Sequence, residues 1–559
     1  MPAGTIQGNL GHYYWQESEG HIHIWFWDEN TKKRPLVSER DPDREALRIL
    51  GTFSLKKGIV AIVLGAASLA LIRQLKKQKE HYGGDILLVE KDELFLHQWE
   101  RLFPDIFADL VVYTGHNPEE LERFIENLSM EQLMGYRIIS VPGSVAIDSF
   151  FYRNTEKKIK ELFAARLSDL FTRLEFEERW IWNILYNIPH MARAKAVRSL
   201  FQTMAGKDAL LVATGPSLRY SLNWLAKMQT RVFLACADSA YRVLHCAGIT
   251  PHLVYTLDAQ SYTLRHFLGL PRGKMGQFPI LVADIVANPQ VLRRWEGELF
   301  LSTTVHFSET KRSTTPGYEI VEEYFLKDSH LGDIQSGGSV ATSLFDLLRQ
   351  MNFARIILVG QDLAYTYRQI HTIGTHHSRE WLSGRVNRFW PLENIEEAIL
   401  HRRHTWSEVS LEGRKIPADY VLSLYRKWFA EAAKSIPQKV IQASFDGLSI
   451  EHSWRIKATD SFIAGEDNFA PERIMLYIKK CPPILARESF YEKWVYFLRE
   501  LDHKLKDALM NYAGRRYEIL AQRVQENSKK DLLLKKKIAR EQWFLKLIER
   551  YRRLYERQI

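Results

Sequence analysis

The sequence predicts a multidomain α/β protein whose central region is a mostly parallel sheet of the Rossmann type. Residues 206–385 alternate short apolar runs with amphipathic helical stretches, which is the pattern of a parallel sheet covered by helices on both faces. Five of the six apolar runs are followed within two residues by glycine or by an acidic residue, as strands are at the carboxyl edge where α/β proteins bind ligands. The chain of 559 residues is also long enough for about three or four domains.

Six apolar runs of the central region are expected to form its strands. They are residues 208–213, 232–237, 253–257, 279–283, 299–302 and 355–359. The first run ends in Gly215-Pro216-Ser217 and is followed by a helical pattern over Leu218–Met228. A strand that passes through a glycine turn into a helix presents backbone N–H groups and the positive end of the helix dipole at one place. This turn is therefore predicted to hold a phosphate.

A second glycine loop, Gly337-Gly338-Ser339, also precedes an apparent helix. We expect Ser217 and Ser339 to lie near each other at the carboxyl edge of the sheet. In that position the backbone N–H groups of both loops would surround a phosphate or carboxylate.

Acidic residues stand at the ends of several expected strands: Asp238, Asp258, Asp284 and the pair Gln361-Asp362. One such acid alone is often a helix cap or a turn residue. Several at one edge of a sheet predict a polar binding site instead.

The flanking regions are expected to form three further parts. Residues 1–150 combine an aromatic strand pattern at 21–27 with a small α/β unit, whose strands at 59–64, 85–89 and 110–113 include one that ends in Glu90. The helical periodicity of residues 151–205 predicts a helical connector, in which Trp180, Trp182, Asn183 and Asn187 are close together in the sequence. Residues 386–559 are expected to form a mostly helical C-terminal region.

The apolar run at residues 58–72 is predicted to be a strand, a turn and a helix. It has 15 residues, whereas a membrane-spanning helix needs roughly 17–25. Gly65 divides the run into a β-rich half and a half rich in alanine and leucine. No membrane span is therefore expected.

Composition restricts the class of protein. Three cysteines form neither a disulfide framework nor a metal cluster, and they fit a reducing compartment. No zinc-protease, zinc-ribbon or Walker motif is present, so no metal ligands are assigned.

The net charge is +10, and residues 529–559 carry eleven Lys or Arg and four Asp or Glu, a net +7. This tail is expected to be a solvated helix face or a surface for an acidic protein partner; no motif indicates nucleic acid.

The motifs together resemble the Maf family, the motility-associated factor glycosyltransferases. The resemblance is carried by short motifs from the N-terminal part to the second half of the central region. They are SERDPDREA at 38–46, LVATGPSL at 211–218, ADSA at 237–240, AGITP at 247–251, LD at 257–258, GGSV at 337–340 and VGQDLAYT at 359–366. His371 follows Asp362 by nine residues, as the family histidine does. The sequence departs from the family pattern at GAASL (65–69), at Ala259 and at SFDG (444–447).

The resemblance implies a cytoplasmic enzyme with a sialyltransferase-like central domain. Such an enzyme transfers a nonulosonic acid, pseudaminic or legionaminic acid, from its CMP-activated donor to Ser or Thr of flagellin. The implied donor-binding residues are Gly215, Pro216, Ser217, Asp238, Gly337, Gly338, Ser339 and Gln361. The implied catalytic residues are His371, Asp258 and Asp362, with His371 as the base that accepts the hydroxyl proton. An imidazole with a reference pKa of about 6.5 suits that role.

Two alternatives remain open from the sequence. One is a pterin diphosphokinase-like enzyme that uses ATP and magnesium, because such enzymes share the Gly-Pro-Ser turn and the strand-end Asp. The other is a non-catalytic flagellin-binding assembly factor. A requirement for a divalent metal is also left open.

Overall fold

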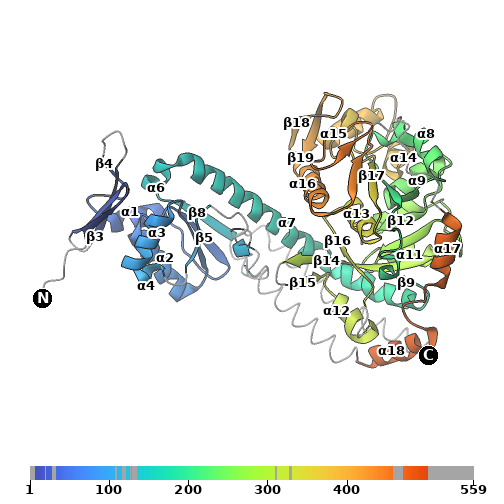
Figure 1. The fold of residues 1–559 in the computed structure, drawn as a ribbon, viewed down its shortest axis with the longest axis horizontal. Helices are drawn as coiled ribbons and strands as arrows, with labels where there is room; N and C mark the ends of the chain where they lie inside the picture. Colours follow the sequence, from blue (N-terminus) through green and yellow to red (C-terminus); the bar gives the residue numbers. More distant parts are fainter. Residues whose placement is uncertain are drawn as a thin grey trace. The chain divides into compact units, whose positions relative to one another are not determined.

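The structure, a computed structural model, divides into two compact units. It describes residues 7–18, 21–27, 33–107, 110–115, 121, 123–125, 128, 135–308, 311–326, 330–456 and 470–500. The first unit extends to Arg173 and the second begins at Leu174. The boundary falls inside helix α7 (Ser149–Asn187), and each unit has its own sheets (Figure 1).

The first unit combines an antiparallel sheet with a parallel one. The antiparallel strands follow in sequence order: β1 (Gln7–Leu10), β2 (Tyr13–Ser18), β3 (His21–Trp27) and β4 (Lys33–Pro35). The parallel sheet has the order β7-β6-β5-β8, with β5 (Ile59–Leu64), β6 (Asp85–Val89), β7 (Val111–Tyr113) and β8 (Gly135–Ser140). Its helices are α1 (Pro42–Leu50), α2 (Leu69–Tyr82), α3 (Glu93–Leu102), α4 (Pro104–Phe107), α6 (Pro142–Ile147) and the first part of α7.

The run at residues 58–72 folds as strand, turn and helix, which confirms the prediction. Strand β5 is buried along most of its length, Gly65 makes the turn with a φ of 98°, and Ser68 caps α2 by accepting the backbone N–H of Leu71. Across the described parts of the chain, every helix is too short or too polar to cross a bilayer.

The second unit is built on a large sheet of mostly parallel strands, which confirms the predicted fold class (Figure 1). The order of its main path is β15-β14-β13-β12-β11-β10-β17-β20-β21, and β9 and β16 both pair with β14. Only β14 and β15 pair antiparallel among the described strands of this sheet. Its strands are β9 (Lys195–Ala196), β10 (Asp208–Val212), β11 (Phe233–Ala237), β12 (Leu253–Thr256), β13 (Ile280–Asp284), β14 (Leu299–Ser308), β15 (Lys311–Thr314), β16 (Asp333–Gln335), β17 (Arg355–Val359), β20 (Lys439–Gln442) and β21 (Trp454–Arg455).

Strands β20 and β21 extend this sheet beyond the segment 206–385 in which the sequence placed it. A separate hairpin, β18 (Thr405–Val409) and β19 (Lys415–Asp419), lies between them and β17 in the chain. The region after residue 386 therefore contributes strands as well as helices. The charged tail at 529–559, which the sequence predicted to be helical, lies outside the described residues.

Helices cover both faces of the large sheet. Alternate residues such as Leu211 and Ala235 belong to one core with α13 and α16, whereas their buried neighbours Leu210 and Leu234 point to the opposite face. Helix α9 packs on β11 and β12. The helices of this unit, after α7, are α8 (Leu218–Met228), α9 (Asp238–Cys246), α10 (Leu264–Phe267), α11 (Pro289–Arg294), α12 (Tyr318–Val321), α13 (Val340–Gln350), α14 (His376–Gly384), α15 (Leu392–Leu400), α16 (Tyr420–Ser435), α17 (Pro471–Lys480) and α18 (Arg487–Glu500).

A buried ion pair fixes helix α17 to the sheet. The Lys195 ammonium donates to Glu298 at 2.6 Å and to the carbonyl of Ile478 at 2.6 Å, and both charged side chains are less than a tenth exposed. The second carboxylate oxygen of Glu298 accepts the N–H of Gly276. Each charged group thus has a further hydrogen bond besides the ion pair itself, which helps the protein to tolerate the burial of both charges.

We expect Lys195→Met to destabilise the second unit by about 3–5 kcal/mol, because it leaves the Glu298 carboxylate buried without its cation. Urea unfolding of the single variant and of the double variant Lys195→Met/Glu298→Gln measures this. The double variant should recover part of the loss. A single variant within about 0.5 kcal/mol of the parent would contradict the role of the pair.

Candidate active site at the carboxyl edge of the large sheet

Strands β10 and β17 are neighbours in the large sheet, and the chain order of the strands reverses between them. Strands β11 to β14 follow on one side of β10, and β17 and β20 lie on the other. Such a reversal leaves a crevice at the carboxyl ends of the two strands, which is the usual ligand position in open α/β sheets. The first glycine turn follows β10 and Asp362 follows β17, so both lie at this point.

Asp362 holds the first glycine turn in place. Its carboxylate accepts the Ser217 backbone N–H at 2.8 Å and the Ser217 hydroxyl at 2.6 Å, and the side chain is 1% exposed. Burial raises the pKa of Asp362 to about 7, and the two bonds from Ser217 oppose that rise. The Gly215 N–H donates to the carbonyl of Gly360 at 2.7 Å. Two N–H groups that the sequence assigned to a phosphate therefore have protein acceptors.

Asp362 is enclosed by two glycines from distant parts of the chain. A Cβ on Gly215 would lie 2.5 Å from the Asp362 Oδ1 atom, and a Cβ on Gly447 would lie 2.6 Å from the Asp362 Cα. Gly447 ends the SFDG segment after β20, where Leu448 donates its N–H to the carbonyl of Asp362 at 2.8 Å. The SFDG segment, at which the sequence departs from the family pattern, thus packs directly against Asp362 at the point where the strand order reverses.

His371 lies beside the same turn. Its Nδ1 atom is 3.3 Å from the Thr214 hydroxyl, which is also 3.3 Å from the hydroxyl of Ser239. Desolvation by the surrounding protein lowers the pKa of His371 to about 4, and His377 and His266 lower it further. The His371 imidazole is therefore neutral near pH 7 and can accept a proton.

The strand-end acids differ in exposure. Asp238 is 3% exposed and accepts the Thr256 hydroxyl at 2.8 Å and the Ser239 N–H at 2.6 Å; burial raises its pKa to about 6. Asp284 is fully buried and accepts the Thr304 hydroxyl at 2.7 Å. Asp258 is exposed to solvent. Its Oδ1 atom accepts the N–H of Gln260 at 2.9 Å, and of these three carboxylates it is the one that is exposed.

The second glycine loop packs against helix α16. The Tyr425 hydroxyl donates to the Gly338 carbonyl at 2.9 Å, and a Cβ on Gly337 would lie 2.5 Å from the indole of Trp428. Ser339 caps α13 in a reciprocal capping box with Thr342. The Gly337 and Ser339 N–H groups both donate to the Thr342 hydroxyl. The closeness of Ser339 to Ser217 stays a prediction.

Gln361 contributes a buried amide to the edge. Its backbone N–H donates to the Ser444 hydroxyl at 3.1 Å, and its side-chain carbonyl is buried without a hydrogen-bond partner among the described atoms. A buried acceptor without a partner costs about 1–3 kcal/mol, so a ligand donor at this position would relieve that cost.

The end of α7 supports the edge from outside. The Asn183 side chain donates to the carbonyls of Ala259 and Val286, and that of Asn187 donates to the carbonyls of Ile285 and Ala287, at 2.8–3.0 Å. These carbonyls belong to the loops that follow β12 and β13. The two asparagines, which the sequence grouped with core tryptophans, thus fix the loops that carry Asp258 and follow Asp284.

Comparisons with known proteins agree with this architecture. A family described as 6-hydroxymethylpterin diphosphokinase MptE-like matches residues 182–368. An uncharacterised protein of Treponema pallidum (strain Nichols) is 28% identical over 162 residues, which are 28% of this chain and 38% of that protein. The solved structure of a Maf glycosyltransferase from Magnetospirillum magneticum AMB-1 superposes with a TM-score of 0.56 at 14% identity, over 92% of this chain and 80% of that one.

The chain has the Maf glycosyltransferase fold. The resemblance indicated by the sequence motifs is confirmed at this level, and the structural likeness covers 92% of the chain and thus parts of both units.

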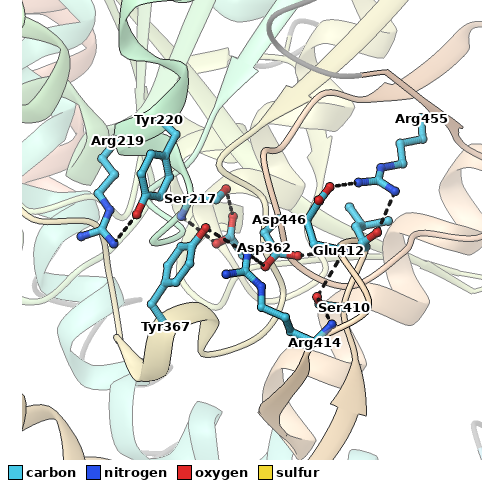
Figure 2. A network of polar contacts seen from close by, with 11 residues as sticks. Ser217, Arg219, Tyr220, Asp362, Tyr367, Ser410, Glu412, Arg414, Asp446 and Arg455 are labelled. Carbon is cyan, nitrogen blue, oxygen red and sulfur yellow. Dashed lines mark hydrogen bonds and ion pairs between the residues drawn. The ribbon is translucent and has the colours of Figure 1, made fainter.

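Sequence reasoning missed a second set of residues at the edge of this Maf fold (Figure 2). The Arg219 guanidinium lies 4.7 Å from the Tyr220 ring centre and 5.0 Å from that of Tyr367. Arg414 lies 4.9 Å from the Tyr367 ring and bonds to Asp446 at 2.6 Å. Tyr220 is 45% exposed. Arg219 and Tyr220 follow the predicted turn directly, so their place next to Ser217 was the available signal; nothing local indicated Arg414.

We expect Gly215→Val to destabilise the second unit by about 2 kcal/mol or more, because its side chain would displace Asp362 from Ser217. Gly384→Ala is the matched control, since a Cβ there meets no atom within 4 Å. Urea unfolding compares the two. Equal stability of both variants would show that the turn has room for a side chain.

Proposed function

We propose that this protein is a cytoplasmic glycosyltransferase that transfers a nonulosonic acid from a CMP-activated donor to a Ser or Thr hydroxyl of flagellin. The fold shared with a Maf glycosyltransferase supports the proposal. The observation that carries it is the neutral, half-buried His371 beside Thr214, at the point where the strand order reverses. Transfer to a hydroxyl is accelerated by a group that accepts the hydroxyl proton, and a neutral imidazole can do so.

The proposed reaction is a single displacement. The acceptor oxygen forms a bond to the anomeric carbon while the bond from that carbon to the phosphate oxygen breaks, and CMP leaves. His371 takes the hydroxyl proton. Asp258 is accessible and either binds the nucleoside or balances the positive charge that develops on the sugar ring. Asp362 and Asp238 have roles that follow from their contacts: they hold the Ser217 turn and the Thr256 strand end.

The donor carries negative charge on its phosphate and on the sugar carboxylate. The Arg219 and Arg414 guanidinium groups both lie against the Tyr367 ring, and guanidinium groups bind such anions well. The charge of Arg414 is partly balanced by its ion pair with Asp446. The Arg219 Nε atom is buried without a hydrogen-bond partner among the described atoms. These residues are the proposed positive side of the donor site.

A pterin diphosphokinase-like enzyme is the second candidate, because the matching family covers residues 182–368. That enzyme would transfer diphosphate from ATP with magnesium. The match to that family covers about a third of this chain, and it does not include the first unit.

Titration of the full chain separates the candidates. The glycosyltransferase should bind CMP without magnesium, and should attach a nonulosonic acid to purified flagellin, which intact mass detects as one added sugar per modified residue. Binding of ATP with magnesium and no binding of CMP would favour the diphosphokinase. Flagellin binding without either nucleotide would favour an assembly factor.

His371→Ala should lower the rate of transfer by about 10²–10⁴-fold, the usual contribution of a general base, and should change CMP affinity only a few-fold. His401→Ala is the control, because His401 is an exposed histidine of the same unit. Single-turnover transfer and CMP titration provide the two readouts. Normal transfer by His371→Ala would reject the assignment and direct attention to Asp258.

The pH profile gives a second check on His371. Its pKa is lowered to about 4, so the basic form is fully populated above about pH 5 and is lost as the pH falls through 4. The acid limb of kcat/KM should therefore lie near pH 4 rather than near 6.5. A limb near 6.5 that persists in His371→Ala would show that another group acts as the base.

A further inference from the structure

A cavity of about 410 Å³ lies entirely within the first unit. It is bordered by the loop after β6, by α6 and the first turns of α3 and α7, and by the β2–β3 hairpin. Its volume falls within the roughly 300–1,000 Å³ of small-molecule sites. Nothing in the proposed transfer reaction uses it.

The cavity occupies the ligand position of its own sheet. The order β7-β6-β5-β8 reads third, second, first and fourth along the chain, and all pairs are parallel. The strand order therefore reverses between β5 and β8, and ligands of such sheets bind beyond the carboxyl ends of the strands at this reversal. Ser144, in the helix that follows β8, and Glu90, which follows β6, both border the cavity.

Glu90 has the position of a ribose-binding acid. It follows the second strand of the sheet and comes 25 residues after Gly65, the turn after the first strand. In Rossmann units an acid about 20 residues beyond the glycine turn binds the ribose hydroxyls. The Glu90 carboxylate accepts the N–H of Ala66 at 2.8 Å, the N–H of Asp92 at 3.1 Å and the Tyr152 hydroxyl at 3.2 Å. An ionised carboxylate has about four acceptor positions, which leaves one for a ligand hydroxyl.

The surroundings favour a ligand without phosphate. The turn after β5 has one glycine, at Gly65, followed by Ala66 and Ala67, whereas a pyrophosphate needs several glycines for close backbone approach. The cavity is also lined by Asp92, Glu93 and Asp148. The one lysine that borders it, Lys91, already pairs with Asp148. A phosphate would therefore meet net negative charge.

Ser144 supplies an independent sign of a missing polar partner. It is 3% exposed, and its hydroxyl is buried with no hydrogen-bond partner among the described atoms. Such a hydroxyl costs about 1–3 kcal/mol unless something bonds to it. The cavity that it borders also has apolar walls at Phe26, Leu94 and Ile147, against which a flat base can lie.

We propose that this cavity binds a ribonucleoside that carries no phosphate, with a ribose hydroxyl on Glu90, a polar ligand atom on Ser144 and the base against the apolar walls. The cavity is lined by residues of the first unit and the proposed donor site by residues of the second, and the proposal does not depend on the proposed transfer activity.

Equilibrium dialysis of the full chain with adenosine, guanosine, cytidine and uridine tests the proposal, together with their 2′-deoxy forms and 5′-monophosphates. At least one ribonucleoside should bind. Its deoxy form and its monophosphate should each bind about tenfold or more weakly, since one hydrogen bond to a charged group is lost in the first case and charge repulsion is added in the second. Hydrogen exchange should show protection in peptides that cover residues 86–95 and 141–152.

Variants locate the binding. Glu90→Gln should weaken the nucleoside by about tenfold or more, while Glu80→Gln, the same change on an exposed position of α2, should leave it unchanged. Leu94→Arg is the second variant, because Leu94 is 70% exposed and borders the cavity; it should block binding without loss of folding. Three results would each overturn the proposal. None of the four ribonucleosides binds, or the deoxy form binds as tightly as the ribonucleoside, or protection from hydrogen exchange is confined to residues 208–217 and 361–372.

Discussion

The double hydrogen bond between Ser217 and Asp362 is the contact on which the candidate site depends. It joins the ends of two adjacent parallel strands, β10 and β17, across 145 positions of sequence. Through it the first glycine turn acquires a fixed shape, and Thr214, which precedes that turn, positions the imidazole of His371. Asp362 therefore helps to position the proposed base His371, although the Asp362 side chain is buried and bonds to the protein rather than to a ligand.

Burial of carboxylates organises the rest of the edge. Asp238, Asp284 and Asp362 each accept a hydroxyl from a neighbouring Ser or Thr, and burial raises the pKa of each of them. Such groups connect strand ends rather than receive a substrate. The exposed Asp258, together with His371 and the arginines around Tyr367, is the part of the edge that we propose binds the ligand.

The sequence predicted much of the framework because the relevant signals are local. The apolar runs at 208–213 and 355–359, the glycine turn and the helix over Leu218–Met228 are found where they were expected. The partners of those residues could not be predicted, because they come from far along the chain: Gly447 beside Asp362, Tyr425 beside Gly338, and Arg414 beside Tyr367. The pairing of Ser339 with Thr342 had a local signal, since a Ser followed three residues later by Thr at a helix start is close to a capping box. The Thr342 hydroxyl of that box accepts the N–H groups of Gly337 and Ser339 in the second glycine loop.

Asp362 between Gly215 and Gly447 also constrains how this edge can change over evolutionary time. A Cβ on Gly215 would meet the Asp362 carboxylate and the Gly360 carbonyl, and a Cβ on Gly447 would meet the backbone of Asp362. A smaller residue at 362 would remove only the contact with the carboxylate, because every residue carries the backbone atoms that make the other contacts. In a set of homologues positions 215 and 447 should therefore stay glycine whichever residue stands at 362, so that the two glycines, rather than the aspartate, would trace this arrangement of the turn.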